Sequence, residues 1–404
     1  MLVAPCDLDD MEFSKALTVV DLFSGCGGTS AGFARRGGFR LAAAVDKEVG
    51  KPSGAASDCN RTYQANLDLV PLARDLATFG PEELAAQAGL HSSHLDVLVG
   101  SPPCTDFSRA VPSNHARDGE RNDLVGRVAL FAEELKPSLV LIENAPEMIR
   151  GTQHHHHRRL VARLKAAGYQ VRSEVQLLTR AGLPQARQRA FVVASRVGRP
   201  LTLRDLWRGW TVRREAVTVR TALARLSNWQ LRHPDDQDGD VWPSMGTAVS
   251  ARIKATPING GGWADLAAST LTAPLLTRDC QARWQRGATG SHPDIYGRMS
   301  LDRPAPTIKR ECSHVGNGRY AHPTADRLLT VREMATLQGF PFDFRFPTRS
   351  VTARYAHIGD AVPPLISFQL ATIATWMLGG SRPDPSSWIM PNTTLQIGDL
   401  VRVH

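Results

Sequence analysis

The chain has 404 residues, of which 42% are hydrophobic and 22% charged, as in an ordinary globular protein with one large domain and a smaller one. It shows no secretion signal and no run of about 18 apolar residues, so we expect neither export nor a membrane span and place the protein in the cytoplasm. The formal charge of +9 suits a polyanionic partner, although a GC-rich coding sequence would give much of the same arginine excess. The six cysteines form no CxxC pair, which argues against a zinc site or a disulfide framework.

Apolar stretches alternate with helix-like segments over the first half of the chain. The apolar runs are short and end in glycine, proline or acidic residues, which is typical of buried strands. Such alternation predicts the α/β class, with a parallel sheet covered by helices on both faces. The expected strands lie within residues 16–25, 39–48, 94–104, 129–148, 169–178 and 188–197.

The pattern changes after about Ser195. Residues 196–300 are rich in tryptophan, arginine, glycine and proline and have little periodicity, which predicts a smaller, loop-rich domain. Helical patterns return within residues 330–341 and 363–378, and the polar tail from Gly379 contains a possible late strand.

A tract of four histidines, His154–His157, interrupts this pattern. Metal binding by such a tract is conceivable, but no cysteine or carboxylate cluster lies nearby in the sequence. We therefore expect a solvated helix start and no metal site.

The segment Asp21–Phe33 carries a strand into a turn with Gly25 and Gly27, before a helix. Glycines at such a turn let a ligand approach the backbone, and an acid at the end of the next strand, Asp46, can bond a ribose hydroxyl. The pattern indicates an adenosine-containing cofactor, and an ordinary glycine turn is the alternative. Ser30 stands where the dinucleotide pattern GxGxxG needs its third glycine.

The segment Gly100–Ser108 places Cys104 just beyond a strand and two prolines. Ligands bind at the carboxyl edge of a parallel sheet, and the prolines stiffen the approach to the thiol. We interpret Cys104 as a nucleophile, whereas the alternative is a small buried thiol.

Glu143 ends a fully apolar strand, so we expect a partly buried acid at the same edge as Cys104. Burial raises the pKa of a carboxyl group and readies it to give a proton. The alternatives are a helix-capping acid and a salt-bridged one.

Gln185, Arg187 and Arg189 alternate along the chain. On one strand they would point to the same face and offer amide and guanidinium donors to a polar ligand. A solvated edge strand is the alternative.

In this order the four motifs resemble those of the bacterial, S-adenosylmethionine-dependent DNA (cytosine-5) methyltransferase family. The resemblance continues in Asn317–Pro341, with its Leu-Gln-Gly-Phe-Pro end, and in Ile358–Pro364, and it covers about residues 17–195 and 296–378. It implies a Rossmann-like methyltransferase sheet with a smaller, loop-rich target recognition domain. The implied domains are the catalytic and cofactor-binding parts 1–195 and 301–378, the recognition domain 196–300 and the tail 379–404.

The resemblance also implies a reaction, in which the thiolate of Cys104 attacks C6 of a flipped-out cytosine in double-stranded DNA. Glu143 would give a proton or a hydrogen bond to N3, while Arg187 and Arg189 orient the ring. A methyl group then passes from S-adenosylmethionine to C5, leaving S-adenosylhomocysteine. By the same resemblance Asp46 would take the cofactor's ribose and Asp75 its adenine amino group. The expected cofactor-binding residues are Phe23, Ser24, Gly25, Cys26, Gly27, Asp46, Lys47, Asp75, Leu76, Pro103, Asp360 and Ala361.

For the DNA substrate we expect two kinds of contact by arginines of residues 196–300. Arg252 and Arg278 would bind phosphates, whereas Arg283 and Arg286, which flank Trp284 in a glycine-bounded loop, would read guanine edges. The alternative is that several of these arginines form surface salt bridges. The complete set expected to bind substrate is Ser108, Asn144, Gln185, Arg252, Arg278, Arg283 and Arg286. We expect a monomer that binds neither a metal nor a membrane.

Three features depart from the family pattern. Ala145 replaces a valine, and Asp360 replaces the late asparagine and brings a carboxylate near the cofactor. An apparent insertion between Asp46 and Tyr63 leaves Glu48 as an alternative to Asp46.

Three rival functions remain at this point. A tRNA cytosine methyltransferase of the same family would share the catalytic residues, but its recognition segment would be shorter. A catalytically silent DNA-binding regulator fits poorly with intact Cys104, Glu143 and Arg187. A nicotinamide-dependent oxidoreductase is disfavoured by the glycine spacing.

Overall fold

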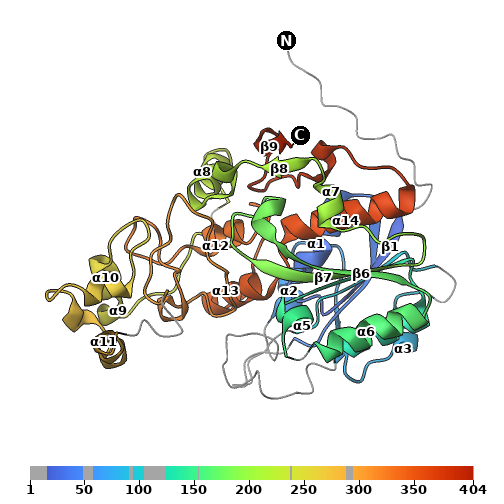
Figure 1. The fold of residues 1–404 in the computed structure, drawn as a ribbon, viewed down its shortest axis with the longest axis horizontal. Helices are drawn as coiled ribbons and strands as arrows, with labels where there is room; N and C mark the ends of the chain where they lie inside the picture. Colours follow the sequence, from blue (N-terminus) through green and yellow to red (C-terminus); the bar gives the residue numbers. More distant parts are fainter. Residues whose placement is uncertain are drawn as a thin grey trace, which may run out of the picture.

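The computed structural model describes residues 16–48, 58–90, 94–103, 124–152, 154–236, 239–287 and 294–403. Its centre is a seven-stranded sheet in the order β3-β2-β1-β4-β5-β7-β6 (Figure 1). Neighbouring strands from β3 to β5 are parallel, whereas β7 is antiparallel to both β5 and β6. The predicted α/β class is therefore confirmed. The strands are β1 Leu17–Leu22, β2 Phe39–Asp46, β3 Leu72–Ala73, β4 Val97–Gly100, β5 Leu139–Asn144, β6 Gln170–Leu177, β7 Gln188–Ser195, β8 Trp210–Val212 and β9 Leu400–Arg402.

Alternate residues of the central strands enter two separate hydrophobic cores. In β4, Val97 and Val99 belong to one core while Leu98 belongs to the other. In β5, Leu141 and Ile142 divide in the same way. This period of two explains why these strands are apolar throughout, because both faces of the sheet are covered.

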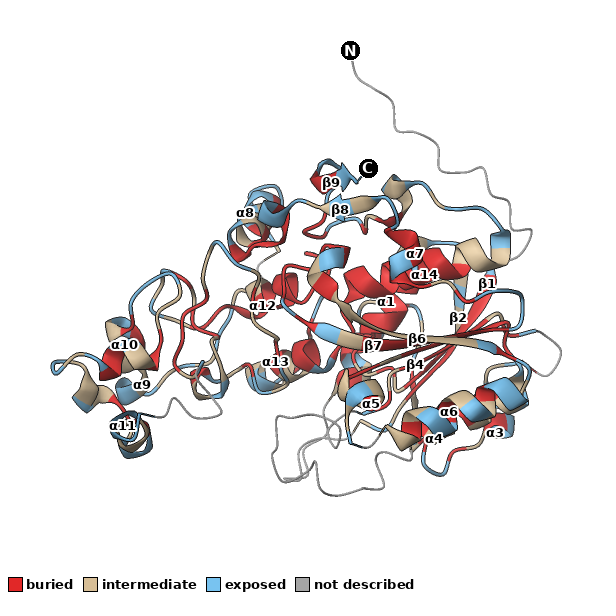
Figure 2. Ribbon diagram, viewed as in Figure 1, coloured by how far each residue is buried: buried red, intermediate tan, exposed pale blue. Residues whose placement is uncertain are grey.

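Helices cover both faces of the sheet (Figures 1 and 2). On one face α1 (Gly28–Arg36) packs against α14 (Pro364–Gly379), and on the other lie α3 (Pro81–Gln87), α4 (Leu124–Leu135) and α6 (His155–Ala166). The remaining helices are α2 Cys59–Gln64, α5 Glu147–Arg150, α7 Leu203–Leu206, α8 Val219–Gln230, α9 Thr247–Ala255, α10 Trp263–Ala267, α11 Arg278–Gln285, α12 Val331–Leu337 and α13 Val351–Asp360, with short 3-10 turns between some of them.

The most apolar helical stretch, Val351–Gly379, is long and apolar enough to cross a membrane by length and composition. It is the one such stretch among the described residues, and 78% of its most apolar window is buried inside the fold. Its α14 part packs on α1 and supplies much of one core, as the core helix of a globular domain does.

Helices α9, α10 and α11 lie at the end of the molecule away from the sheet, with α12 and α13 between them and the strands (Figure 1). Ile253, Trp263 and Cys280 form the apolar centre of this outlying part and share one core with residues of α12 and α13. Arg298, only 1% exposed, donates to the backbone oxygens of Ile253 and Thr256 and so braces the part from inside.

The compositional change at Ser195 does not coincide with the start of the outlying part. Trp207, just after α7, donates from its indole nitrogen to Gln369 of α14 at 2.8 Å and stacks on Trp388 at 5.6 Å. Strand β8 pairs with β9, which confirms the late strand expected in the tail. Residues soon after 195 and the tail after 379 therefore pack on the sheet side of the molecule.

The histidine tract begins α6, as expected of a helix start, with His154 as the residue before the helix. His156 is buried, however, and its ring lies 4.1 Å from that of His155. The tract is thus only partly solvated.

Candidate active site

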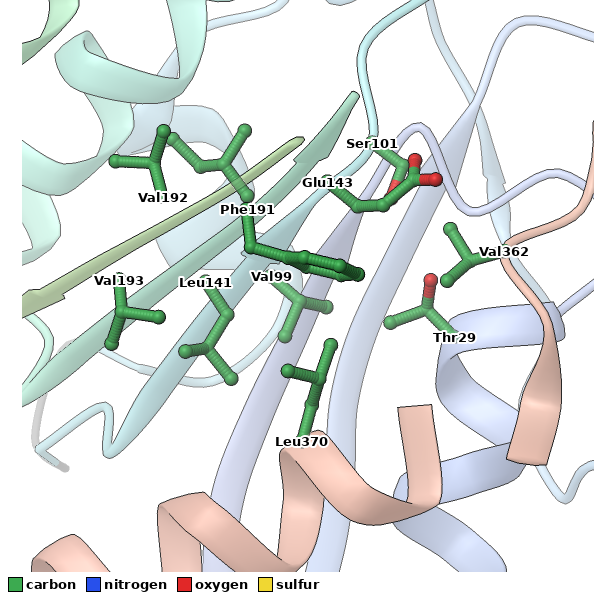
Figure 3. A pocket seen from close by; sticks show the side chains of 11 residues that line it. Thr29, Val99, Ser101, Leu141, Glu143, Phe191, Val192, Val193, Val362 and Leu370 are labelled. Atoms are coloured by element: carbon green, nitrogen blue, oxygen red, sulfur yellow. The ribbon is translucent and has the colours of Figure 1, made fainter. Parts of the chain in front are cut away.

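A pocket opens at the carboxyl edge of the sheet, between β4, β5 and the start of α1 (Figure 3). Glu143 and Ser101 lie together at one end, facing Thr29 and Val362 across the opening. The apolar floor consists of Val99, Leu141, Ile142, Phe191, Val192, Val193 and Leu370. Polar groups at the mouth of an apolar pocket are typical of a small-ligand site.

Glu143 is held by Arg189, whose Nε lies 2.8 Å from the carboxylate. The side chains are only 12% and 14% exposed, and they come from the adjacent antiparallel strands β5 and β7. Glu143 therefore combines the expected strand-end position with the alternative of a salt-bridged acid. Sheltered from water, this pair interacts more strongly than a surface ion pair would.

Asn144 fixes the chain that leads to Cys104. Its amide nitrogen donates to the carbonyl oxygen of Pro102 at 3.0 Å, and its amide oxygen accepts from the backbone of Ala145 at 2.8 Å. Asn144 is 1% exposed, so both groups serve the protein itself rather than a base. Cys104 and Ser108 lie outside the described residues.

Gln185 and Arg187 differ from the expectation of a shared strand face. Strand β7 begins only at Gln188, and Gln185 instead forms an isolated bridge to Ala305. Gln185 is 0% exposed and donates to Gln338 at 2.6 Å, while its oxygen accepts from the backbone of Ile308 at 3.0 Å.

Arg187 is 2% exposed and donates to the carbonyl oxygen of Ile308 at 2.8 Å. Of the three alternating residues, Arg189 is the one whose ion pair with Glu143 is seen among the described residues. The sheet therefore brings Arg189 to Glu143. Gln185 and Arg187 bind the backbone of Ile308.

The glycine turn after β1 is tied to the end of β2. The backbone nitrogen of Gly25 donates to Asp46 at 2.9 Å, and Phe23 and Gly25 have φ values of 60° and 53°. Glu48 turns away and accepts from the backbone of Asn60 at 2.8 Å. The structure therefore places Asp46, rather than Glu48, at the turn.

The residues at this turn fit an adenosine cofactor with an amino-acid end. The hydroxyl oxygen of Ser24 is buried and has no hydrogen-bond partner among the described residues, so it is available to a ligand. A Cβ atom added to Gly25 would meet nothing within 4 Å, which shows that space lies beside the backbone. Lys47, which follows Asp46 in the chain, forms an ion pair with Asp75.

The other expected cofactor residues take varied positions around the turn. Cys26 is buried, donates to the carbonyl oxygen of His357 at 3.5 Å, and has its thiol pKa raised by burial. Leu76 and Ala361 are buried as well, whereas Pro103 is exposed. Gly27, like Gly25, has a positive φ, of 92°.

Asp360 lies beside this turn and pairs with Arg310. The surrounding protein raises the pKa of Asp360 to about 6, even though its side chain is 47% exposed, and the charge of Arg310 opposes the shift. Sequence reasoning singled out Asp360 but missed Arg310, because nothing in the sequence pairs residues so far apart.

A series of buried hydrogen bonds lies beside the turn, and it was not predicted from the sequence either. Ser30 donates to Asp21 at 2.6 Å, and the hydroxyl of Tyr63 donates to Ser30 at 2.8 Å. Asp21 is 0% exposed, and burial raises its pKa to about 7, with the nearby Asp46 adding to the rise. The signal was present, because Asp21 ends the apolar strand that feeds the glycine turn.

The outlying arginines separate into partly buried and exposed ones. Arg252 donates to the carbonyl oxygen of Leu275 at 2.5 Å and lies 5.1 Å above the ring of Tyr296, so its guanidinium serves the fold. The phosphate contact expected of Arg252 stays a prediction. Arg278 and Arg286 are exposed.

The loop expected around Trp284 is instead the helix α11. On it Arg283 pairs with Asp279 at 2.9 Å, as the salt-bridge alternative foresaw. Trp284 is 41% exposed and its ring contacts Trp263 edge-on at 6.4 Å.

Comparisons with known proteins agree with this fold and site. The family model of C-5 cytosine-specific DNA methylase matches residues 17–374. Type II methylase M.HgiDII of Herpetosiphon aurantiacus is 28% identical over 85% of this chain and 91% of its own length. Type II methyltransferase M.XorII of Xanthomonas oryzae is 28% identical over 94% of this chain and 88% of its own.

Two solved structures share the fold. One is a DNA modification methyltransferase encoded within an E. coli prophage, with a TM-score of 0.60, 20% identity, and coverage of 90% of this chain and 100% of that one. The other is the S. pombe Dnmt2 methyltransferase, with a TM-score of 0.54, 15% identity, and coverage of 90% and 99%. The chain belongs to the family of C-5 cytosine-specific DNA methylases.

Proposed function

We propose that this enzyme transfers a methyl group from S-adenosylmethionine to C5 of a cytosine flipped out of a specific double-stranded DNA sequence. The observation that carries the proposal is the Glu143–Arg189 pair at the edge of the pocket, beside the clamped turn that leads to Cys104. The family match supports the reaction class, and the Type II names of the relatives favour a role in restriction-modification.

The residues of the chain then divide the work on the base. The Cys104 thiolate adds to C6, which makes C5 nucleophilic, and Glu143 stabilises N3 as the ring gains electron density. Once C5 carries the methyl group, a base removes the C5 proton and the bond between Cys104 and C6 breaks. Arg189 keeps the Glu143 carboxylate in position throughout.

Asn144 would position the thiol, because its hydrogen bond to the carbonyl oxygen of Pro102 fixes the backbone two residues before Cys104. A thiolate that its neighbours hold in place would need little reorganisation when the base arrives. Flipping the base out of the duplex costs a few kcal/mol, which contacts to the extruded base must offset.

The cofactor would supply the methyl group as an electrophile on a positively charged sulfur. Asp46 and the unpartnered hydroxyl of Ser24 are placed to bind its polar groups, and the open side of Gly25 leaves room for it. The Lys47–Asp75 pair would border the adenosine end.

The outlying part with α9, α10 and α11 would carry sequence recognition. Of the predicted target recognition domain, about residues 196–300, the first residues pack on the sheet side and would belong to the catalytic part. The exposed Arg278 and Arg286 support this assignment, because arginines are well suited to phosphates and guanine edges. We propose double-stranded DNA as the partner and the bacterial cytoplasm, near the nucleoid, as the location.

Bisulfite sequencing of DNA from cells that express the chain tests the proposal and gives the target site. We expect one short sequence to carry methylated cytosine, and a Cys104→Ser variant to leave it unmethylated, because a hydroxyl is a far weaker nucleophile at neutral pH. Methylation of tRNA but not DNA by the purified protein would favour the tRNA alternative. Full methylation by Cys104→Ser would overturn the assignment of the nucleophile.

A further inference from the structure

We propose that Arg310 is a positioning residue for the cofactor, which neutralises Asp360 and thereby lets the pocket accept the carboxylate of the cofactor's amino-acid end. The inference deepens the proposed function and rests on S-adenosylmethionine being the cofactor. Its starting point is the ion pair between Arg310 and Asp360, whose side chains are 31% and 47% exposed.

Asp360 is close in the chain to a residue that lines the pocket. Asp360 is the last residue of α13, and Val362, two residues later, lines the pocket (Figure 3). A Cβ atom on Gly359 would lie 2.2 Å from the carbonyl oxygen of Lys309, so the backbones on the two sides of the pair are in close contact. The ion pair therefore joins two segments that are already fixed against each other.

Asp360 lies close enough to the glycine turn for its charge to act there. Cys26, within that turn, donates to the carbonyl oxygen of His357 in the same helix as Asp360. Asp360 is also the principal charge that raises the pKa of the Cys26 thiol, after burial itself. An uncompensated carboxylate at residue 360 would therefore act on anything bound at the turn.

The turn opens onto the amino end of α1, which runs from Gly28 and has no acidic residue in its first turn. The amide groups there carry partial positive charge and favour an anionic ligand group. Thr29, in this first turn, lines the pocket. The carboxylate of an amino-acid end thus belongs where a bare Asp360 would repel it, and Arg310 removes that repulsion.

The segment that carries Arg310 is itself well anchored. Ile308 accepts from Arg187 at 2.8 Å and donates to Gln185 at 3.0 Å. Arg310 is thus presented to Asp360 from a fixed backbone.

Calorimetric titration of the full chain with S-adenosylhomocysteine tests the inference. We expect Arg310→Met to weaken binding roughly tenfold at pH 8, the scale of removing one partner from a half-buried charge pair. The double variant with Asp360→Asn should return to within about threefold of wild type, because it removes the charge that needs compensation. Asp360→Asn alone should bind as well as wild type or better.

Two further arms separate this role from a structural one. Binding of 5′-methylthioadenosine, which lacks the amino-acid end, should be unchanged in Arg310→Met. In Arg310→Met the pKa of Asp360 should lie higher than in wild type, because Arg310 no longer opposes the shift. At pH 6 and below, Asp360 of the variant is therefore neutral, and its affinity for S-adenosylhomocysteine should approach that of wild type. Arg220→Met, which breaks the exposed pair with Asp302 elsewhere, is the matched control and should change neither affinity.

Equal loss of affinity for both ligands in Arg310→Met, or no recovery in the double variant, would overturn the proposed role of Arg310. So would S-adenosylhomocysteine affinity equal to wild type in Arg310→Met. A wild-type protein that does not bind S-adenosylhomocysteine at all would instead overturn the cofactor assignment, and this inference with it.

Discussion

Arg189 and Glu143 form an ion pair of 2.8 Å across two adjacent antiparallel strands, with both side chains largely shielded from water. The pair unites two motifs that lie 46 positions apart in the chain, the end of the apolar strand β5 and the start of β7. Glu143 lines the pocket beside Ser101.

We expect Glu143→Gln to lower turnover by roughly 100-fold or more, the usual scale for a general acid, while duplex binding persists. Arg189→Met should also lower turnover strongly, because it leaves the Glu143 carboxylate without its partner. The two changes act on one unit, so the double variant should lose much less than the product of the single effects. Single-turnover methylation measures this, and Glu134→Gln, on the exposed side of α4, is the control. Fully multiplicative effects would contradict the coupling.

Replacing Asn144 with leucine should destabilise the protein and misplace Cys104. The change removes the donor to Pro102 and the acceptor for Ala145, and a buried polar group left unpaired costs about 1–3 kcal/mol. Urea denaturation gives the loss of stability. The rate of Cys104 alkylation in the folded protein reports the position of the thiol, and a rate equal to wild type would mean that Asn144 does not position it.

Asp21 should make stability depend on pH. Its pKa is about 7 in the folded protein, because of burial, against 3.8 in the unfolded chain, so the folded state binds more protons between these values. Its contribution to stability is therefore fully present below about pH 4, falls as the pH rises to about 7, and is flat above.

Asp21→Asn removes this dependence, and its oxygen can still accept from Ser30. Relative to wild type, the variant should gain about 1.4 kcal/mol for each pH unit within that window. Urea unfolding at pH 5, 6, 7 and 8 measures the gap. Parallel stability curves would show that Asp21 does not titrate in this range.

The arginines of the outlying part should differ in what their loss does. Arg278→Ala and Arg286→Ala should leave stability unchanged but weaken DNA binding, and each phosphate contact removed lowers the salt slope by about one unit. Arg252→Ala should instead lower thermal stability, because its guanidinium binds Leu275 and covers Tyr296.

Binding to cognate and scrambled duplexes at two salt concentrations separates these effects. A guanine contact would cost roughly 1–3 kcal/mol on the cognate duplex alone. If neither Arg278→Ala nor Arg286→Ala changes affinity or sequence preference, the recognition surface lies elsewhere.

The α/β class, the long strands, the glycine turn and the strand-end position of Glu143 could all be predicted from the sequence. These features follow from local patterns, since apolar runs, turn residues and strand ends are set by neighbours in the chain. The sequence could not determine the two-residue strand β3, which carries too short a pattern, or that β7 begins only after Arg187.

Which polar groups form ion pairs and hydrogen bonds with each other became clear from the tertiary structure. The pairing of Arg189 with Glu143, of Arg310 with Asp360, and the clamp of Asn144 on Pro102 depend on strand order and on close backbone packing. Likewise, the same phosphate contact was predicted for Arg252 and Arg278, but in the structure Arg252 is partly buried and bonded to Leu275, whereas Arg278 is exposed. Contacts between distant residues have no local signal, because the folded chain, and not the neighbouring residues, brings the partners together.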